Sequence, residues 1–427
     1  MLTRIEIDGF KTFRGFALDV PPFLVVLGAN ASGKSNLFDA FAFLARLAGG
    51  ASVMDAVRAD RSQLYELVHR DTPGRRTDLV RFGVEVLLPG EASDAGVRYE
   101  LDLAVIGEDP LDPEGTERLV IRDERWFLLP HPDEPVTIPS PLVYTPAGDR
   151  PEDEAVSRRF PATRAFRPAV SLAVGSGQER LNAVIGAVRQ EIAAWRVLPA
   201  EPSALRRPDS YDDEDRLAPS GAHLPNALAR IARRTATPGR PEGALTDIRN
   251  EVATVVPEAW DVRVVEVKSV QTRFVDIGTS DGDFSANAVS DGTLRALALV
   301  AALNDPDDTG LLCVEEPENG VYPLRLARLV RLLSGAAASG ARRQVIVSTH
   351  SPAVLAALDP AAGQALREDA VLMAIASRTR GRGEGISRIS VVHPLRGDVS
   401  VPLPADLPGP IMSTAQIEEF LGRGVHA

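Results

Sequence analysis

The chain has 427 residues, of which 44% are hydrophobic and 25% are charged, and its formal net charge is −12. Such a length is typical of two or three ordinary domains, or of one large domain with an insertion. The acidic balance argues against a protein coated in positive charge, so nucleic-acid binding would need a local basic face. The single cysteine, Cys313, excludes an internal disulfide framework and a cysteine-based zinc site.

No run approaches the roughly 18 apolar residues of a membrane-spanning helix, and the N-terminal stretch has no apolar signal core. We therefore expect a cytoplasmic protein without a membrane partner. The six histidines are scattered and show no metal-ligand spacing.

Hydrophobic periodicity predicts the elements in chain order. The first half contains strands at 2–8, 14–20 and 23–27, helical stretches at 34–47 and 52–69, and strands at 79–87, 97–106 and 118–128. An amphipathic helix at 177–197 precedes a proline-rich, charged stretch at 199–221, which is interpreted as an exposed loop or linker. The second half contains helices near 224–234 and 243–253, strands at 260–268 and 271–278, a helix from 291 to about 303, a strand at 310–314, a helix at 323–335, and strands at 343–350, 369–376 and 386–392.

Residues 28–35 read GANASGKS and fit the pattern G-x-x-x-x-G-K-[ST]. They follow an apolar strand and open an amphipathic helix, which is the context that a phosphate-binding loop needs. Its glycines let backbone N–H groups surround phosphates, Lys34 reaches the β- and γ-phosphate oxygens, and Ser35 supplies an oxygen to Mg²⁺. The sequence thus predicts binding of a nucleoside triphosphate.

The stretch NAVSDGTLRALAL, residues 287–299, has a glycine in the first turn of a predicted helix. Gly292 costs that helix about 1 kcal/mol relative to alanine and lets another group approach the backbone. One interpretation is that Ser290 caps the helix and Gly292 is a tolerated turn residue. The other is that the turn offers free N–H groups to an anion brought by another part of the assembly.

Two apolar strands end in residues suited to catalysis. LLCVEEPENG, residues 311–320, ends in two carboxylates, and in P-loop proteins such a strand end lies beside the phosphate loop. Glu315 is assigned to Mg²⁺ and Glu316 to orienting the attacking water; the alternative is an ordinary charged strand end. VIVSTHSP, residues 345–352, contains His350, whose alternative role is structural.

The order of these motifs resembles that of ABC-type ATPases, specifically the RecF, SMC and OLD-like branch and the related bacterial predicted ATPases of the AAA family. GANASGKSN resembles their Walker A motif, VSDGT their signature, LLCVEEPENG their Walker B motif and STHSP their switch-histidine loop. IEIDGFKTFRG resembles the first strands of an SMC head. The resemblance covers about 1–50 and 285–360.

This resemblance implies an α/β fold: a P-loop NTPase of the ABC/SMC-head type, with a mixed sheet, a flanking antiparallel sheet and a helical insertion. It divides the chain into an N-terminal half of the head with the flanking sheet (1–150), a helical insertion with the proline-rich loop (151–258), and a C-terminal half with signature, Walker B and switch histidine (259–427).

The resemblance also implies an ATP hydrolase that uses Mg²⁺ and forms a homodimer induced by ATP. In such ATPases the signature of one subunit contacts the γ-phosphate bound by the other, so Gly292 would let the backbone reach phosphate while Ser290 donates a hydrogen bond. The nucleotide-binding residues expected are Gly28, Asn30, Ser32, Gly33, Lys34, Ser35, Asn36, Lys11, Ser290 and Gly292. The catalytic residues expected are Glu316 and His350, and the metal ligands Ser35 and Glu315.

The chain departs from the family pattern at three points. Glu315 stands where Walker B usually carries an aspartate, and Tyr322 where a histidine is common. The usual metal-contacting glutamine has no clear counterpart, and Gln63 and Gln178 are the candidates.

Two functions fit best: an ATP-driven switch in a DNA-associated process, in repair or anti-phage defence, or an ATP-driven regulator of a separate effector such as a nuclease or toxin, without direct DNA binding. A nuclease of the OLD type would need a Toprim domain, and 365–400 lacks a matching acidic cluster. A transporter subunit lacks support as well. Three basic stretches, at 157–167, 229–234 and 377–383, could contact DNA phosphates or be solvated surface.

Overall fold

The structure is a computed structural model, and it describes residues 1–59, 63–72, 75–88, 96–106, 117–129, 179–338, 343–351, 354, 370–382 and 385–394. The elements up to residue 193 are β1 (Leu2–Asp8), β2 (Phe16–Asp19), β3 (Phe23–Leu27), α1 (Lys34–Ala48), α2 (Val53–Ala59), α3 (Leu64–Leu67), β4 (Arg70–Thr72), β5 (Arg75–Arg76), β6 (Leu79–Leu87), β7 (Gly96–Ile106), β8 (Arg118–Leu128) and α6 (Glu179–Ala193).

The elements from residue 196 onward are β9 (Arg196–Leu198), α7 (Pro202–Leu205), β10 (Asp209–Ser210), α8 (Leu224–Thr235), α9 (Leu245–Val255), β11 (Asp261–Val267), β12 (Thr272–Thr279), β13 (Gly282–Ser285), the 3-10 turn η2 (Ala286–Ala288), α10 (Asp291–Leu303), β14 (Leu311–Glu315), α11 (Pro323–Ala338), β15 (Gln344–Thr349), β16 (Ala370–Arg382) and β17 (Gly385–Pro394). No helix in these described ranges is long and apolar enough to span a membrane.

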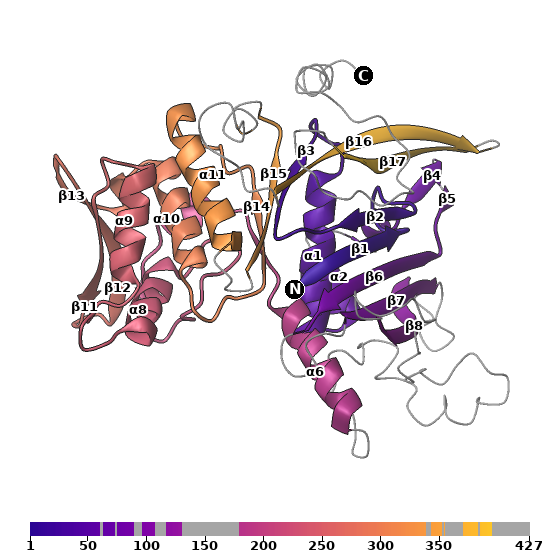
Figure 1. Ribbon diagram of the computed structural model, residues 1–427, viewed down its shortest axis with the longest axis horizontal. Coiled ribbons are helices and arrows are strands. Elements are labelled where there is room, and N and C mark those ends of the chain that lie inside the picture. The colour runs from indigo at the N-terminus through magenta and orange to yellow at the C-terminus, as the bar shows by residue number, and fades with distance from the viewer. Residues whose placement is uncertain are drawn as a thin grey trace.

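A six-stranded mixed sheet, in the order β17-β16-β3-β15-β14-β9, lies at the centre of the molecule (Figure 1). Five of its strands are parallel, and β17 runs antiparallel to β16. β3 and β15 are buried along their whole length, which explains why the sequence shows continuous apolar runs there. Because parallel strands end at one edge of a sheet, the residues that follow β3, β9, β14 and β15 meet at that edge.

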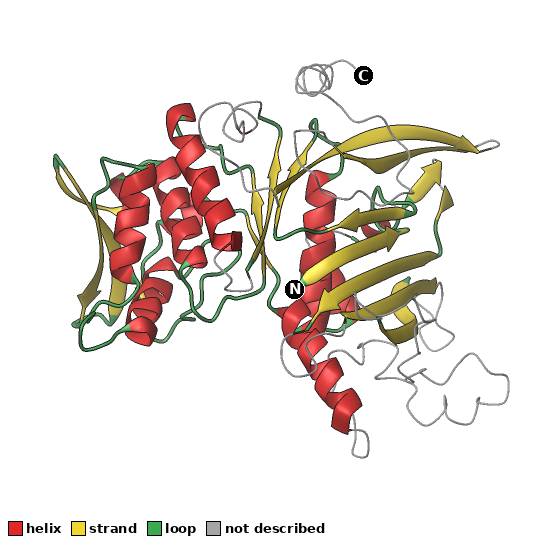
Figure 2. Cartoon of the chain, viewed as in Figure 1, coloured by secondary structure: helices red, strands yellow, loops and turns green. Residues whose placement is uncertain are grey.

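Each face of the central sheet packs against a different layer (Figure 2). On one face, α1 lies between the central sheet and the antiparallel sheet β2-β1-β6-β7-β8. On the other face, α8, α9, α10 and α11 form a helical layer. Alternation along β3 serves both layers, since Leu24 and Val26 enter the first core while Val25 and Leu27 enter the second. The mixed sheet and the flanking antiparallel sheet confirm the predicted fold class.

The predicted helix at 177–197 is too long. The helix α6 ends at Ala193, and Arg196–Leu198 forms β9, which pairs in parallel with β14. Trp195, at the junction, is 4% exposed and lies edge-on to Phe41 of α1. Tertiary packing therefore overrides the helical pattern at this point. The stretch 52–69 likewise forms two short helices, α2 and α3, rather than one.

The interpretation of 199–221 as an exposed loop or linker holds for residues 212–216, which are exposed and lie outside helices and strands, but the stretch as a whole is not a separate linker. Leu205 and Leu217 are buried in the core of the helical layer, and the stretch contains α7 and β10. Pro202 occupies the first turn of α7, where a missing N–H group is harmless. The proline and the charged residues thus mark turns and capping sites of an ordered segment. The three-part division of the chain at 150/151 and 258/259 remains a prediction.

Candidate nucleotide-binding site

The loop between β3 and α1 has a backbone suited to binding an anion. Ala31 and Gly33, two residues apart, both have left-handed conformations, with φ of 60° and 108°. A backbone in which left-handed residues alternate with others forms anion-binding concavities. No side chain in the described part of the protein caps the start of α1, so its first N–H groups can bind a ligand or water. The Ser32 hydroxyl is buried and has no partner among the described residues. These features fit a bound phosphate chain.

Two residues that the sequence did not single out form hydrogen bonds that hold this loop and the start of α1 in place. Ser390 of β17 donates a hydrogen bond to the backbone oxygen of Ser32 at 2.7 Å. Thr12 lies 2.7 Å from the Ser390 hydroxyl and accepts a hydrogen bond from the Asn36 amide at 2.8 Å. A Cβ atom on Gly33 would overlap the Ser390 hydroxyl, so only glycine fits there. Thr12 and Ser390 lie far apart in the sequence, and no local pattern links them.

Lys34 is held at the base of the loop. Its ammonium group donates to the backbone oxygens of Gly28 at 2.6 Å and Ala29 at 3.0 Å. Burial lowers the pKa of Lys34, and the nearby carboxylates of Glu316, Glu318 and Glu315 oppose that shift. An anionic ligand would offset the free-energy cost of burying this charged ammonium group.

Glu315, at the end of β14, meets the first turn of α1. The Ser35 hydroxyl forms a hydrogen bond with its carboxylate. Burial raises the pKa of Glu315, the bond from Ser35 opposes this, and the charges of Asp39 and Glu316 reinforce it. A hydroxyl and a partly buried carboxylate that touch each other are the hard oxygen ligands that Mg²⁺ prefers. The donor set therefore fits the metal that the sequence predicts.

Glu316 is fixed by hydrogen bonds of its side chain and its backbone. One carboxylate oxygen lies 2.8 Å from Nδ1 of His350, and the other accepts from the Asn319 amide at 2.7 Å. Its backbone N–H donates to Ser348 of β15 at 2.9 Å. Glu316 also has a left-handed backbone, with φ of 43°, which is strained for a residue with a side chain. Such strain at a carboxylate beside a histidine is typical of a functional position.

A third carboxylate, that of Glu318, also lies near His350. Its Oε1 accepts from the Thr349 hydroxyl at 2.5 Å, and its Oε2 is buried without a partner in the described part of the chain. The side chain is 10% exposed and lies 3.9 Å from Nδ1 of His350. Glu318 was not among the predicted site residues, although its place two residues after Glu316 was a usable signal.

These elements surround a cavity of about 630 Å³. The predicted residues that line it are Asn30, Gly33, Lys34, Ser35, Asn36, Glu315 and Glu316. The residues that line it without having been predicted are Thr12, Ala31, Pro199, Glu201, Arg295, Asn319 and Ser348. Pro199 and Glu201 follow β9, whose strand character the sequence analysis missed. Glu201 is therefore an additional oxygen donor at the edge where the parallel strands end.

The two candidate glutamines do not add to this cavity. Gln63 forms a capping box with Glu66 at the start of α3, and Gln178 lies outside the described residues. Lys11 donates to Asp39 at 2.6 Å and lines a second hollow of about 570 Å³. That hollow shares Thr12 and Asn36 with the main cavity. The nucleotide contact expected for Lys11 remains a prediction.

The signature turn lies at the start of α10, outside the set of described residues that line the main cavity. Ser290 is the N-cap, and its hydroxyl accepts a hydrogen bond from the Thr293 N–H at 3.3 Å. A Cβ atom on Gly292 would overlap the carbonyl oxygen of Gly320, in the turn after β14. The close approach that requires glycine is therefore made within the chain. A phosphate contact at this turn remains a prediction.

Comparison with known proteins agrees with this site. Residues 23–143 and 189–356 match the family described as "AAA domain, putative AbiEii toxin, Type IV TA system", which is more than half of the chain. A segment of 95 residues is 35% identical to the DNA replication and repair protein RecF of Acidothermus cellulolyticus. A segment of 78 residues is 36% identical to the chromosome partition protein Smc of Methanocaldococcus jannaschii. These segments are 22% and 18% of this chain, but only 24% of that RecF and 6% of that Smc.

Solved structures share the fold at low sequence identity. An Smc head bound to the C-terminal winged-helix domain of ScpA aligns with a TM-score of 0.54 and 12% identity, over 92% of this chain and 98% of that one. An Smc head with an extended coiled coil from Pyrococcus furiosus, bound to the C-terminal domain of ScpA, gives 0.52 and 12%, over 92% and 96%. The chain thus belongs to the family of AAA-domain proteins named above, and it has the P-loop fold of ABC-type ATPases related to RecF and SMC proteins.

Proposed function

We propose that this protein is a Mg²⁺-dependent ATPase, two copies of which close head to head around ATP and act as a switch in a DNA-associated process such as repair or antiviral defence. The observation that carries the proposal is one cavity lined by the phosphate loop, Glu315 and Glu316, with His350 bonded to Glu316. The sequence similarity to RecF and Smc proteins supports the DNA-associated role.

The contacts of each residue support its proposed role. Lys34 binds the β- and γ-phosphate oxygens, because its ammonium group already lies at the base of the loop. Ser35 and Glu315 hold Mg²⁺, which supplies positive charge beside the phosphate oxygens when it is bound. Glu316 orients water and accepts its proton, while His350 fixes one oxygen of that carboxylate.

The placement of the signature turn supports a shared site. Ser290 and Gly292 do not line the main cavity among the described residues, although Arg295 of the same helix does. The Ser290 hydroxyl bonds to Thr293, and the positive end of α10 favours an anion. A second copy is the source of a phosphate that completes both sites at once.

Dimerisation tests this function directly. Glu316→Gln keeps the side-chain shape and removes the carboxylate that accepts the proton, so ATP binds and is not cleaved. Sedimentation with ATP and Mg²⁺ should show a dimer for this variant and a monomer for Glu316→Gln combined with Ser290→Arg. A dimer that forms equally well without ATP, or one that Ser290→Arg leaves intact, would overturn the sandwich.

A mixing experiment tests whether the sites are shared between copies. Lys34→Ala lacks a working phosphate loop and keeps its signature, whereas Ser290→Arg lacks a signature and keeps its loop. Each variant alone should be inactive. A mixed dimer carries one intact composite site, so mixing should restore hydrolysis. Inactivity of the mixture, when both variants fold, would argue that each chain hydrolyses ATP without its mate.

A specific observation favours a second candidate, an ATP-driven regulator of a separate effector that does not bind DNA. In the basic stretch 229–234, Arg230 is buried and paired with Asp305 and Asp307, and Arg234 lies 2.7 Å from Asp307. These arginines are neutralised within the fold. The stretch 157–167 and the side chains of 377–383 lie outside the part that the structure describes. Fluorescence anisotropy with duplex DNA separates the two candidates.

A further inference from the structure

The signature turn carries an acidic residue where a phosphate is expected to arrive. Asp291 is the first helical residue of α10, and its side chain is 60% exposed. A carboxylate at this position interacts favourably with the positive helix end. The negative charge of Asp291, however, also repels a phosphate that approaches the free backbone N–H groups at the start of α10. The chain therefore needs a means of neutralising Asp291 when the mate's nucleotide comes near.

One arginine contacts both sides of Ser290. A guanidinium nitrogen of Arg206 donates to Asp291 Oδ1 at 2.6 Å and to the backbone oxygen of Val289 at 3.0 Å. The Arg206 side chain is 26% exposed, so it is partly shielded from solvent while Asp291 is not. The contacts both neutralise the carboxylate and hold the turn that carries Ser290.

Arg206 belongs to an ordered segment, which gives these contacts a fixed geometry. It ends α7, and its backbone N–H donates to Pro202 at 3.2 Å. At the start of α7, the Glu201 N–H donates to the backbone oxygen of Ser220 at 2.8 Å. The two ends of the segment from 201 to 220 are therefore tied together beside the signature turn.

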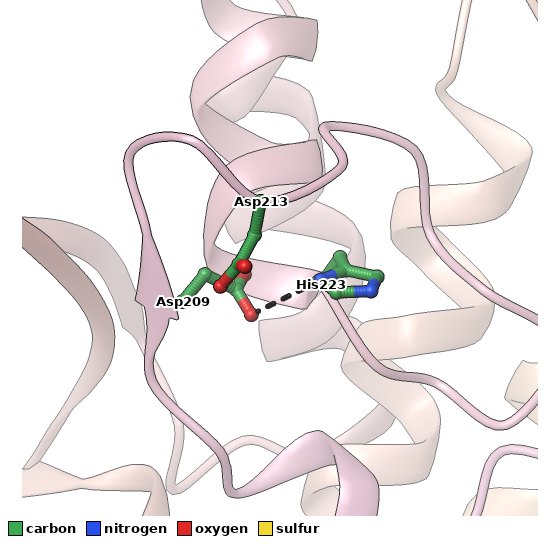
Figure 3. A group of neighbouring side chains, drawn as sticks. All are labelled: Asp209, Asp213 and His223. Carbon is green, nitrogen blue, oxygen red and sulfur yellow. Dashed lines mark ion pairs between the residues drawn. The ribbon is translucent and has the colours of Figure 1, made fainter.

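A cluster of side chains fixes the same segment further along (Figure 3). Asp209 is 3% exposed, lies 3.4 Å from Nδ1 of His223, and accepts from the Asn226 N–H at 3.0 Å. Asp213 accepts from the Ser210 N–H at 2.6 Å. These contacts join β10, the loop after it and the start of α8. Arg206, three residues before Asp209, therefore belongs to a loop that these contacts hold in place.

We propose that Arg206 is a positioning residue for the composite ATP site: it neutralises Asp291 and fixes the Ser290 turn, so that the phosphate chain bound by a second copy can approach α10. This inference rests on the proposed head-to-head dimer. Partly exposed ion pairs contribute little to folding stability. Loss of the pair should therefore leave the melting temperature nearly unchanged. Its expected effect is a weaker ATP-dependent dimer.

The test uses the full chain with Glu316→Gln, ATP and Mg²⁺, and measures the dimer dissociation constant by sedimentation. Arg206→Ala should raise that constant about tenfold, the scale of a typical coupling between sites. Arg206→Lys should keep part of the effect, because lysine retains the charge and loses the forked geometry. Arg207→Ala, at the exposed neighbouring position, is the matched control and should leave the constant unchanged.

Rescue separates positioning from a general structural role. If Arg206 acts by neutralising Asp291, adding Asp291→Asn to Arg206→Ala should restore the dissociation constant to within about threefold of the parent, because the repelling charge is gone. ATP binding to the chain's own phosphate loop, measured by calorimetry on dilute monomer, should be the same in all variants. Thermal melts check that each variant folds.

The outcomes are distinct. If the Glu316→Gln parent shows no ATP-dependent dimer, the proposed function fails and this inference falls with it. If the parent dimerises and Arg206→Ala dimerises as tightly, the inference alone is overturned. If Asp291→Asn leaves the Arg206→Ala defect in place, the neutralising role of Arg206 is overturned, since a lost charge balance could not then be the cause.

Discussion

Gly292 and Gly320 contact each other so closely that a Cβ atom on Gly292 would overlap the Gly320 carbonyl oxygen. Gly320 has a left-handed backbone, with φ of 77°, and closes the turn that carries Glu316. The first turn of α10 therefore contacts the turn that follows β14. Excluded volume prevents either turn from moving closer to the other, because this contact joins backbone to backbone.

Gly292→Ala should destabilise the protein by about 1–3 kcal/mol, because backbone atoms cannot move aside for the new methyl group. Gly335→Ala, in α11, is the matched control: apart from the adjacent helix backbone, no atom of the described residues lies within 4 Å of its Cβ position, and alanine favours the helix by about 1 kcal/mol. Urea denaturation measures both. Equal stability of Gly292→Ala and the parent would show that the two turns separate readily.

Lys34→Ala should weaken ATP binding by at least about 100-fold, because the charge-assisted contacts to the phosphate oxygens are lost. The free protein should remain folded, since burial already disfavours the charged form of Lys34. Lys268→Ala, at an exposed position, is the control. Micromolar binding of an ATP analogue to Lys34→Ala, measured by calorimetry, would contradict the phosphate-loop assignment.

His350→Ala should lower the hydrolysis rate by about 100-fold, because Glu316 loses the contact that fixes one of its oxygens. ATP binding should change little, since His350 does not line the cavity among the described residues. His350→Gln keeps a hydrogen-bond donor and should retain more activity than alanine. A rate defect matched by an equal loss of ATP affinity would place His350 in binding instead.

Glu315 makes stability depend on pH. Burial raises its pKa above the ordinary 4.5, so the folded state binds this proton more tightly than the unfolded state does. The stabilising contribution is present below pH 4.5 and is lost as the pH rises through the raised pKa. Glu315→Gln should therefore become more stable relative to the parent from pH 4 to pH 8, without Mg²⁺ or nucleotide.

Urea midpoints at several pH values measure that difference, and Glu214→Gln, at an exposed position, is the control. A difference between Glu315→Gln and the parent that stays constant with pH would show that Glu315 titrates alike in both states. Adding ATP and Mg²⁺ should stabilise the parent and not Glu315→Gln, because the metal needs the carboxylate.

DNA binding, if direct, should be weak, independent of sequence and strengthened by ATP. Its affinity should fall steeply with salt, because each phosphate contact releases counterions. Replacing Arg378, Arg380 and Arg382 by alanine should reduce the salt slope, whereas Arg234→Ala should not, because Arg234 is paired with Asp307 at 2.7 Å. An absence of binding at 50 mM salt with ATP and Mg²⁺ would favour the protein effector.

The sequence by itself determined the elements that form the edge of the site. The apolar strand before Gly28, the periodic helix after Lys34 and the buried strand before Glu315 are all specified by local patterns, and the structure has each of them. The glycines, lysine and serine of the phosphate loop were readable because their chemistry demands those residue types at one fixed spacing.

Only the tertiary structure decided which distant segments complete the site. Ser390 and Thr12 brace the phosphate loop across 378 residues, and no local pattern encodes that contact. β9 looked helical because its residues continue an amphipathic pattern, and pairing with β14 turned it into a strand that brings Glu201 to the cavity. Gly292 is the clearest case: the sequence left open whether it is a tolerated turn residue or allows a close approach, and packing places the Gly320 carbonyl against it, since excluded volume is a property of the folded chain.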